Sequence, residues 1–207
     1  MLCQALRHLR LARVGIVGLG GAILVLGAPA FAAGPVETCR QTIAEGLRIL
    51  NDPQGRTPEA TPLQQERLRA VLADGFDFTE FSKRVLAEKW DAFLPAQRTE
   101  FVDVFSKFLG NYYLAQLLKH YTDETVTCRG QEALGPARAV VKADVVWRSR
   151  PIPVEVHMLK RAGRWRAYDV GAIGFSAVAI YRVQFREILR THSPAQVIAL
   201  VRSRMDE

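Results

Sequence analysis

The spacing of apolar residues predicts helices over the first part of the chain. In the clearest case, the run from Phe101 to Leu117 places apolar side chains at a period of about 3.6 residues, and Pro95 stands where a helix start tolerates a missing N–H. A stretch rich in proline, glycine and polar residues, 51–61, predicts a loop. The predicted helices are Val36–Leu50, Leu63–Leu72, Thr79–Trp90, Pro95–His120, Ala177–Leu189 and Pro194–Arg204.

Between the long helix and the last two, the pattern changes to alternation. Val141, Ala143 and Val145 share one face of an extended segment, whereas Lys142 and Asp144 take the other, which is the period of a strand with one wet face. Helices, then an antiparallel meander, then closing helices predict an α+β fold with four strands. The predicted strands are Thr125–Arg129, Ala137–Arg148, Ile152–Arg161 and Arg164–Ile173, the last two joined by a tight turn at Ala162-Gly163.

Residues 1–32 have the composition of a cleaved export signal. Three arginines, at positions 7, 10 and 13, precede the uncharged apolar run Val14–Leu26, and Ala30-Phe31-Ala32 fits the small-x-small pattern of a cleavage site. The apolar run is shorter than the roughly 18 residues that a membrane-spanning helix needs. The sequence therefore predicts an exported, soluble mature protein with a single domain over residues 33–207. An uncleaved N-terminal anchor is the alternative.

Charge changes this picture only modestly. Removal of the signal takes three arginines from the 28 basic residues and none of the 21 acidic ones, so the net charge falls from +7 to +4. A scattered excess of this size suits acidic partners or lipid headgroups and gives little support for nucleic-acid binding.

Cysteine content leaves two possibilities open. Cys39 and Cys128 remain in the mature chain, and an oxidising compartment would permit a disulfide between the first helix and the first strand. Such a bridge closes a long loop and is worth about 4–5 kcal/mol in the chain-entropy model. Two buried, inert thiols are the alternative.

Motifs typical of catalytic and metal sites do not occur in the sequence. His8, His120, His157 and His192 lie far apart, none at zinc-binding spacing from a carboxylate, and there is no Cys-x-x-Cys. A phosphate-binding glycine loop and a Gly-x-Ser-x-Gly nucleophile elbow are also missing. The sequence thus predicts no metal, no cofactor and no catalytic residue.

The segment Trp165–Ser176, WRAYDVGAIGFS, carries a more specific signature. It places a strand, a glycine break and a helix N-cap at Ser176 just before Tyr181-Arg182-x-x-Phe185. The segment 94–101, LPAQRTEF, and the pair Tyr112-Tyr113 add to the pattern. In combination these positions, from about Phe76 to the C-terminus, resemble the MlaC/toluene-tolerance family of periplasmic phospholipid-binding proteins.

This resemblance implies an NTF2-like cone, in which helices wrap a curved antiparallel sheet around an apolar cavity. It implies a carrier, not an enzyme, that holds the acyl chains of one phospholipid and serves outer-membrane lipid asymmetry. In the periplasm the carrier would shuttle lipid between an inner-membrane MCE/ABC transporter complex and an outer-membrane lipoprotein–porin complex. The residues expected to bind lipid are Phe105, Leu109, Tyr113, Val141, Val145, Val154, Val156, Met158, Tyr168, Val170, Phe175 and Val178.

Departures from the family pattern leave other functions open. Ile173 stands where many members have an acidic residue, and Ile180 replaces a frequent asparagine, which leaves room for the hopanoid-associated HpnM branch. A further alternative is an NTF2-like isomerase that uses Asp169 with Tyr168, although alternation predicts that only one of the two faces inward. The last alternative is a ligand-free interaction module. For a carrier, the irregular segments 51–61 and 74–78 are candidate moving parts.

Overall fold

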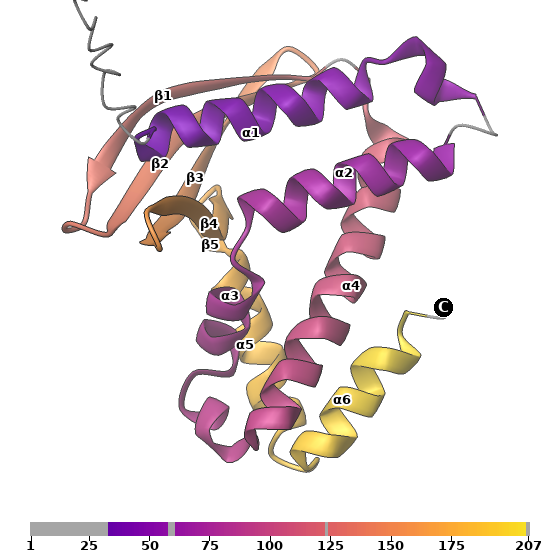
Figure 1. The fold of residues 1–207 in the computed structure, drawn as a ribbon, viewed down its shortest axis with the longest axis vertical. Coiled ribbons are helices and arrows are strands. Elements are labelled where there is room, and N and C mark those ends of the chain that lie inside the picture. Colours follow the sequence, from indigo (N-terminus) through magenta and orange to yellow (C-terminus); the bar gives the residue numbers. More distant parts are fainter. Residues whose placement is uncertain (1–32, 58–60, 123, 206–207) are drawn as a thin grey trace, which may run out of the picture. The chain divides into compact units, whose positions relative to one another are not determined.

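The computed structural model describes residues 33–57, 61–122 and 124–205, which belong to one compact unit. The predicted export signal, residues 1–32, lies outside the described residues. Figure 1 shows how the helices and strands are arranged. The helices are α1 Pro35–Leu50, η1 Pro53–Arg56, α2 Thr61–Gly75, α3 Phe78–Leu86, η2 Ala87–Ala92, α4 Pro95–His120, α5 Ala177–Ile188 and α6 Pro194–Ser203, where η marks a 3-10 helix. The strands are β1 Thr125–Ala133, β2 Arg138–Trp147, β3 Arg150–Arg161, β4 Arg164–Ala172 and β5 Phe175–Ser176.

The predicted α+β order is confirmed. The sheet is a meander of antiparallel neighbours in the order β1-β2-β3-β4-β5. Helix α1 packs on β1, β2 and β4, and α2 runs beside α1 (Figure 1). Helices α3, α5 and α6 gather around the first part of α4 on the other side of the unit (Figure 1).

Helix α4 occupies the predicted range. Pro95 takes a first-turn position, and the Leu94 N–H donates to the Gln97 side-chain oxygen at 3.0 Å, which satisfies one donor that the first turn leaves free. Its early apolar residues Phe101 and Phe105 are fully buried. The aromatic period in the sequence therefore reports the packed face of this helix.

Several elements differ from the predictions: the predicted loop 51–61 contains η1, and β1 extends beyond Arg129 to Ala133. The third helix ends at Leu86 because Ala87 adopts a φ of 49°, in the left-handed region, and the chain continues as η2. A two-residue strand, Phe175–Ser176, pairs with the end of β4 and makes the sheet five-stranded instead of four-stranded. Neither the left-handed residue nor the short strand has a signal in hydrophobic periodicity.

A bulge in β4 overturns the alternation argument for Tyr168 and Asp169. His157 pairs with Asp169 and Met158 pairs with Ala167, so Tyr168 is an extra residue without a partner in β3. Both Tyr168 and Asp169 are buried, 5% and 6% exposed. The prediction that only one of them faces inward is wrong because the bulge breaks the period of two.

The described residues form three hydrophobic clusters. The largest joins α3, α4, α5 and α6 around Phe101 and Phe105. The second lies between α1 and the sheet and contains Cys39 and Val141. The third joins the end of α1, α2 and the last turns of α4 through Leu114. Helix α4 thus takes part in two separate cores.

The start of α5 is fixed by a buried carboxylate. Ser176 is the N-cap, as predicted, and its hydroxyl oxygen accepts from the Ala179 N–H at 3.1 Å. The same hydroxyl donates to Asp169 at 2.5 Å, and the second Asp169 oxygen accepts from the Val178 N–H at 3.0 Å. Asp169 therefore ties the end of β4 to the positive end of the α5 dipole.

We predict that Asp169→Ala lowers the free energy of unfolding by about 1–3 kcal/mol, because it leaves the buried Val178 N–H without a partner. Urea denaturation measures the change. The control is Asp103→Ala on exposed α4 surface, where the carboxylate pairs only with Lys107 at 2.9 Å and is worth about 0.3–0.5 kcal/mol. Equal effects of the two substitutions would contradict the proposed anchor.

The cysteines predicted as a possible bridge are neighbours between α1 and the sheet. Cys39 from α1 and Cys128 from β1 are both buried in the second cluster, and both are free thiols in this structure. Burial, together with the adjacent Cys128 thiol, raises the pKa of Cys39 to about 12. The Cys39 thiol is consequently protonated at neutral pH, where the thiolate needed for exchange is scarce.

We predict that a disulfide between Cys39 and Cys128 forms slowly in air at pH 7, because oxidation starts from a thiolate and the Cys39 thiolate is scarce. A thiol oxidase should accelerate its formation. Ellman titration of the unfolded protein after each treatment counts the remaining thiols. Reduction of the bridged form should lower the free energy of unfolding by about 4–5 kcal/mol. Two titratable thiols after prolonged exposure to the oxidase would refute the bridge.

Candidate functional site

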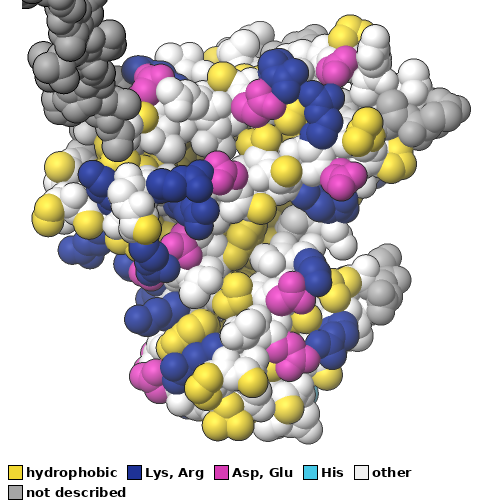
Figure 2. All heavy atoms as spheres, viewed as in Figure 1, with side chains coloured by type: hydrophobic (Ala, Val, Ile, Leu, Met, Phe, Trp, Pro, Cys, Tyr) yellow, Lys and Arg dark blue, Asp and Glu magenta, His cyan; other side chains and the backbone are white. Residues whose placement is uncertain are grey.

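An apolar hollow of about 370 Å³ lies where α2, α3, α4, α5 and β4 meet. Its lining contains no charged side chain, and the only side-chain polar atoms are two tyrosine hydroxyls. Figure 2 shows hydrophobic side chains in the middle of this face, between the two groups of helices. The residues that line it are Leu72, Phe76, Phe78, Phe81, Leu109, Gly110, Tyr113, Val170, Ala177 and Tyr181.

Helix α4 supplies one wall of this hollow through Leu109, Gly110 and Tyr113. A Cβ placed on Gly110 would meet no atom within 4 Å, so the glycine leaves open space beside the helix backbone. The facing aromatic group comes from the α2–α3 region, where Phe76 lies 4.8 Å from Phe78 and 5.6 Å from Phe81 between ring centroids. The hollow is therefore bounded by phenylalanine rings on one side and, on the other, by a segment of α4 in which Gly110 has no side chain.

The segment 74–78, which borders this hollow, is fastened to the sheet. The Asp77 N–H donates to the Ala167 carbonyl at 2.7 Å, and Phe76 forms a bridge with the same residue. The Asp77 carboxylate also pairs with Arg161 at 3.0 Å and caps α3 by accepting from the Glu80 N–H. These bonds hold the candidate moving part against β4, so movement there would have to break them.

Two tyrosines close the hollow on the side of α5. The Tyr113 and Tyr181 hydroxyl oxygens are 3.2 Å apart and share a hydrogen bond between α4 and α5. Burial, with this hydrogen bond, raises the pKa of Tyr181 above that of a free phenol, so its hydroxyl stays protonated at physiological pH. Tyr113 is half-exposed, which places the pair near the surface.

A second apolar hollow of about 580 Å³ lies between α4, α5 and α6. Tyr113 and Tyr181 line it as well, so the tyrosine pair stands between the two hollows. Its other lining residues are Phe105, Phe108, Tyr112, Ile180, Gln184, Phe185, Glu187, Ile188, Leu200, Val201 and Arg204.

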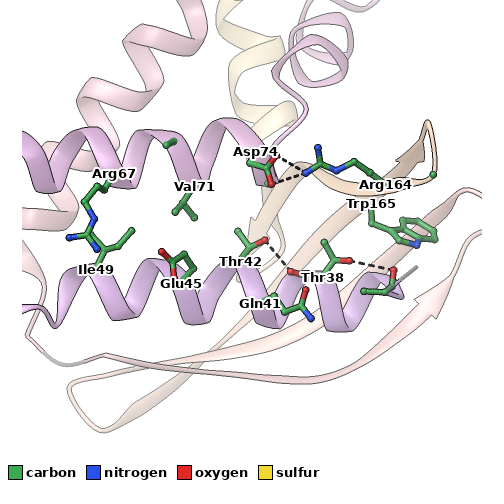
Figure 3. A pocket seen from close by; sticks show the side chains of 14 residues that line it. Thr38, Gln41, Thr42, Glu45, Ile49, Arg67, Val71, Asp74, Arg164 and Trp165 are labelled. Carbon is green, nitrogen blue, oxygen red and sulfur yellow. Dashed lines mark hydrogen bonds and ion pairs between the residues drawn. The ribbon is translucent and has the colours of Figure 1, made fainter. Parts of the chain in front are cut away.

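A third hollow, about 640 Å³, is larger but differs in chemistry (Figure 3). It lies between α1, α2 and the β3–β4 turn, and polar side chains such as Thr38 and Thr42 point into it. Its charged groups are already paired: Arg164 with Asp74 at 2.6 Å, Arg67 with Asp52 at 3.3 Å, and Glu45 with Arg48 at 2.6 Å. Volume alone would favour this third hollow, but the first hollow, whose lining has no charged side chain, is a better match for an aliphatic ligand.

The predicted lipid-binding residues are distributed over several places. Leu109, Tyr113 and Val170 line the first hollow, and Phe105 lines the second. Three others, Val141, Met158 and Val178, belong to packed cores. Three more are half-buried on the sheet outside both apolar hollows: Val145, Val154 and Val156. Tyr168 lies 4.2 Å beneath the Arg84 guanidinium, and Phe175 is 69% exposed.

The aromatic wall and the partner of Tyr113 are not among the predicted lipid-binding residues. Phe76 and Phe78 belong to the irregular segment 74–78 and Phe81 to the predicted third helix, although three phenylalanines within six positions are a visible signal of an apolar surface. Tyr181 was noticed only as part of a family motif, and no pattern in one chain shows that it faces Tyr113.

Other kinds of site gain no support from the described part of the chain. Its histidines, cysteines and acidic residues form no group of three or more that could hold a metal ion. None of the helices described is long and apolar enough to cross a membrane.

Comparison with known proteins gives a consistent result. A family model described as MlaC protein matches residues 40–203. A solved structure of a phospholipid-binding protein from Ralstonia solanacearum, in complex with a phospholipid, superposes with a TM-score of 0.72 at 20% sequence identity. That match covers 84% of this chain and 98% of the other, and at this identity it establishes the fold. None of the curated proteins compared with the sequence matches it.

Proposed function

This chain belongs to the MlaC family, and from that premise we propose that it is a lipid carrier. An acyl chain of the lipid binds in the apolar hollow between β4 and helices α2, α3, α4 and α5. The observation that carries the proposal is the lining itself, which is apolar and aromatic apart from two tyrosine hydroxyls. A phospholipid is also the ligand of the Ralstonia protein that shares the fold.

Burial of chain is physically sufficient for such a carrier. Each methylene group removed from water contributes about 0.8 kcal/mol, so a short stretch of chain already gives appreciable affinity. The lining has no charged group that could fix a headgroup, and the headgroup would therefore remain at the mouth in water. Binding of this kind needs no catalytic residue.

The structure offers little to the isomerase alternative. Both carboxylate oxygens of Asp169 accept hydrogen bonds from the start of α5, and Asp169 lines neither apolar hollow. Tyr168, its proposed helper, lies beneath Arg84. A base that is already bonded in this way would have to give up a helix anchor to accept a proton from a substrate.

In the cell, we propose, the carrier works in the periplasm and passes lipid between an inner-membrane MCE/ABC transporter complex and an outer-membrane lipoprotein–porin complex. A cargo held by its chains, with its headgroup exposed, suits transfer between two such complexes. A hopanoid is the second candidate cargo, since its polycyclic body is also recognised by apolar contact.

The first experiment is native mass spectrometry of the mature protein purified without detergent, followed by lipid extraction. We expect a stoichiometric lipid adduct, and the extracted species decides between a phospholipid and a hopanoid. A clean apo mass that also refuses both added phosphatidylglycerol and an added hopanoid would refute the carrier function.

We predict that Gly110→Leu abolishes lipid retention without loss of stability. The new side chain enters open space in the hollow, and replacing glycine within a helix favours folding by up to about 1 kcal/mol. Native mass spectrometry measures retained lipid, and urea denaturation measures stability.

The matched control is Gly46→Leu. Gly46 is also a helix-interior glycine with no atom within 4 Å of an added Cβ, but it lies in α1 and lines neither apolar hollow. Lipid retention by Gly110→Leu equal to that of Gly46→Leu would show that the hollow is not the site.

A further inference from the structure

The two apolar hollows are separated by very little material. Tyr181 packs edge-on against Phe81, which lines the first hollow, at 6.1 Å, and against Phe105, which lines the second, at 5.3 Å. Tyr113 completes the partition from α4 through the 3.2 Å hydrogen bond. Phe81 and Phe105 also stack on each other at 5.7 Å, so the partition consists of these two buried rings together with the hydrogen-bonded tyrosine pair.

The second hollow matches the first in the chemistry of its walls. Most of its lining is phenylalanine, tyrosine, isoleucine, leucine and valine from α4, α5 and α6, and of these Tyr112, Tyr113 and Ile180 are about half exposed. Its charged and amide side chains, Gln184, Glu187 and Arg204, are exposed to solvent. Its volume of about 580 Å³ falls in the range usual for small-molecule sites, about 300–1,000 Å³.

We propose that the second hollow is a separate acyl-chain subsite, and that Tyr113 and Tyr181 mark the point where the two chains of one lipid part. One chain enters between α3, α4 and β4, and the other enters between α4, α5 and α6. This inference rests on the proposed carrier function and extends it, because it assigns a second place for chain and a role to the tyrosine pair.

The tyrosine hydroxyls fit the branch point of a glycerolipid. They bond to each other in this structure, and Tyr113 is half-exposed, so its ring can turn after loss of one hydrogen bond. A lipid seated across the pair places its ester oxygens, which are acceptors only, beside two phenol donors. The pair thereby exchanges its mutual bond for bonds to the ligand.

The test compares a two-chain probe, phosphatidylglycerol, with a one-chain probe, lysophosphatidylglycerol, by native mass spectrometry titration. The variant Ile180→Trp places a large ring in the second hollow only, since Ile180 does not line the first. The control Val183→Trp alters the same helix at a similarly exposed aliphatic residue that lines neither hollow.

We expect the wild type and Val183→Trp to prefer the two-chain probe by about tenfold or more, because burial of only a few extra methylenes gives that factor. Ile180→Trp should lose this preference while its affinity for the one-chain probe stays unchanged. Leu200→Trp, from the facing helix α6, should reproduce the loss if the site is a hollow between the helices. The double variant Tyr113→Phe, Tyr181→Phe should weaken the two-chain probe, which has two acyl esters, more than the one-chain probe, which has one.

A two-chain preference that survives in both Ile180→Trp and Leu200→Trp would overturn the second subsite and leave the carrier function intact. Loss of both probes in Gly110→Leu, with no effect from the two tryptophans, would confine both chains to the first hollow. Failure of the wild type to bind either probe would instead refute the proposed phospholipid-carrier function, and the subsite with it.

Discussion

The structure depends on a single helix that must pack in two cores at once. The first half of α4 buries Phe101 and Phe105 against α3, α5 and α6, and its last turns bury Leu114 against α1 and α2. After Leu109, which still belongs to the first core, α4 presents Gly110 and the half-exposed Tyr113 to the hollow. Close packing of side chains normally eliminates such space. Here α4 crosses a space between the two cores that neither of them fills, and this space is the first apolar hollow.

Charge is kept away from this hollow by local pairing. Asp77 and Glu80 hold Arg161, and Asp74 holds Arg164, so the acids and bases nearest to the α2–α3 segment satisfy one another. An unpaired charge beside an apolar hollow would draw water into it and weaken the binding of aliphatic chain. The same pairs attach the phenylalanine wall to the β3–β4 hairpin. Ion pairing thus helps to hold the phenylalanine wall against the hairpin and compensates the charges beside the hollow.

Sequence patterns predicted those features that depend on local chemistry. The range of α4 follows from its aromatic period and from Pro95, and the start of α5 follows from the capping preference of Ser176. Features that depend on long-range contacts were not predictable. The bulge at Tyr168 breaks the alternation of β4, so that Tyr168 and Asp169 are both buried, and Ala87 in a left-handed conformation ends a helix that periodicity would continue. Of the proposed lining, Leu109, Tyr113 and Val170 came together, whereas Val141 and Met158 were equally apolar but lie under α1.

The packing of α1 also sets the order in which the molecule can fold. This helix is the first element of the described chain, yet its apolar face rests on β1, β2 and β4, which are far later in the sequence. Contacts of such long sequence separation form late because the intervening chain must first be ordered. The sheet is built from adjacent hairpins, whose contacts are close in sequence, whereas α1 needs β1, β2 and β4 to be in place. A chain that lacks β4 therefore cannot complete the core between α1 and the sheet, and the apolar face of α1 stays exposed until β4 has been added.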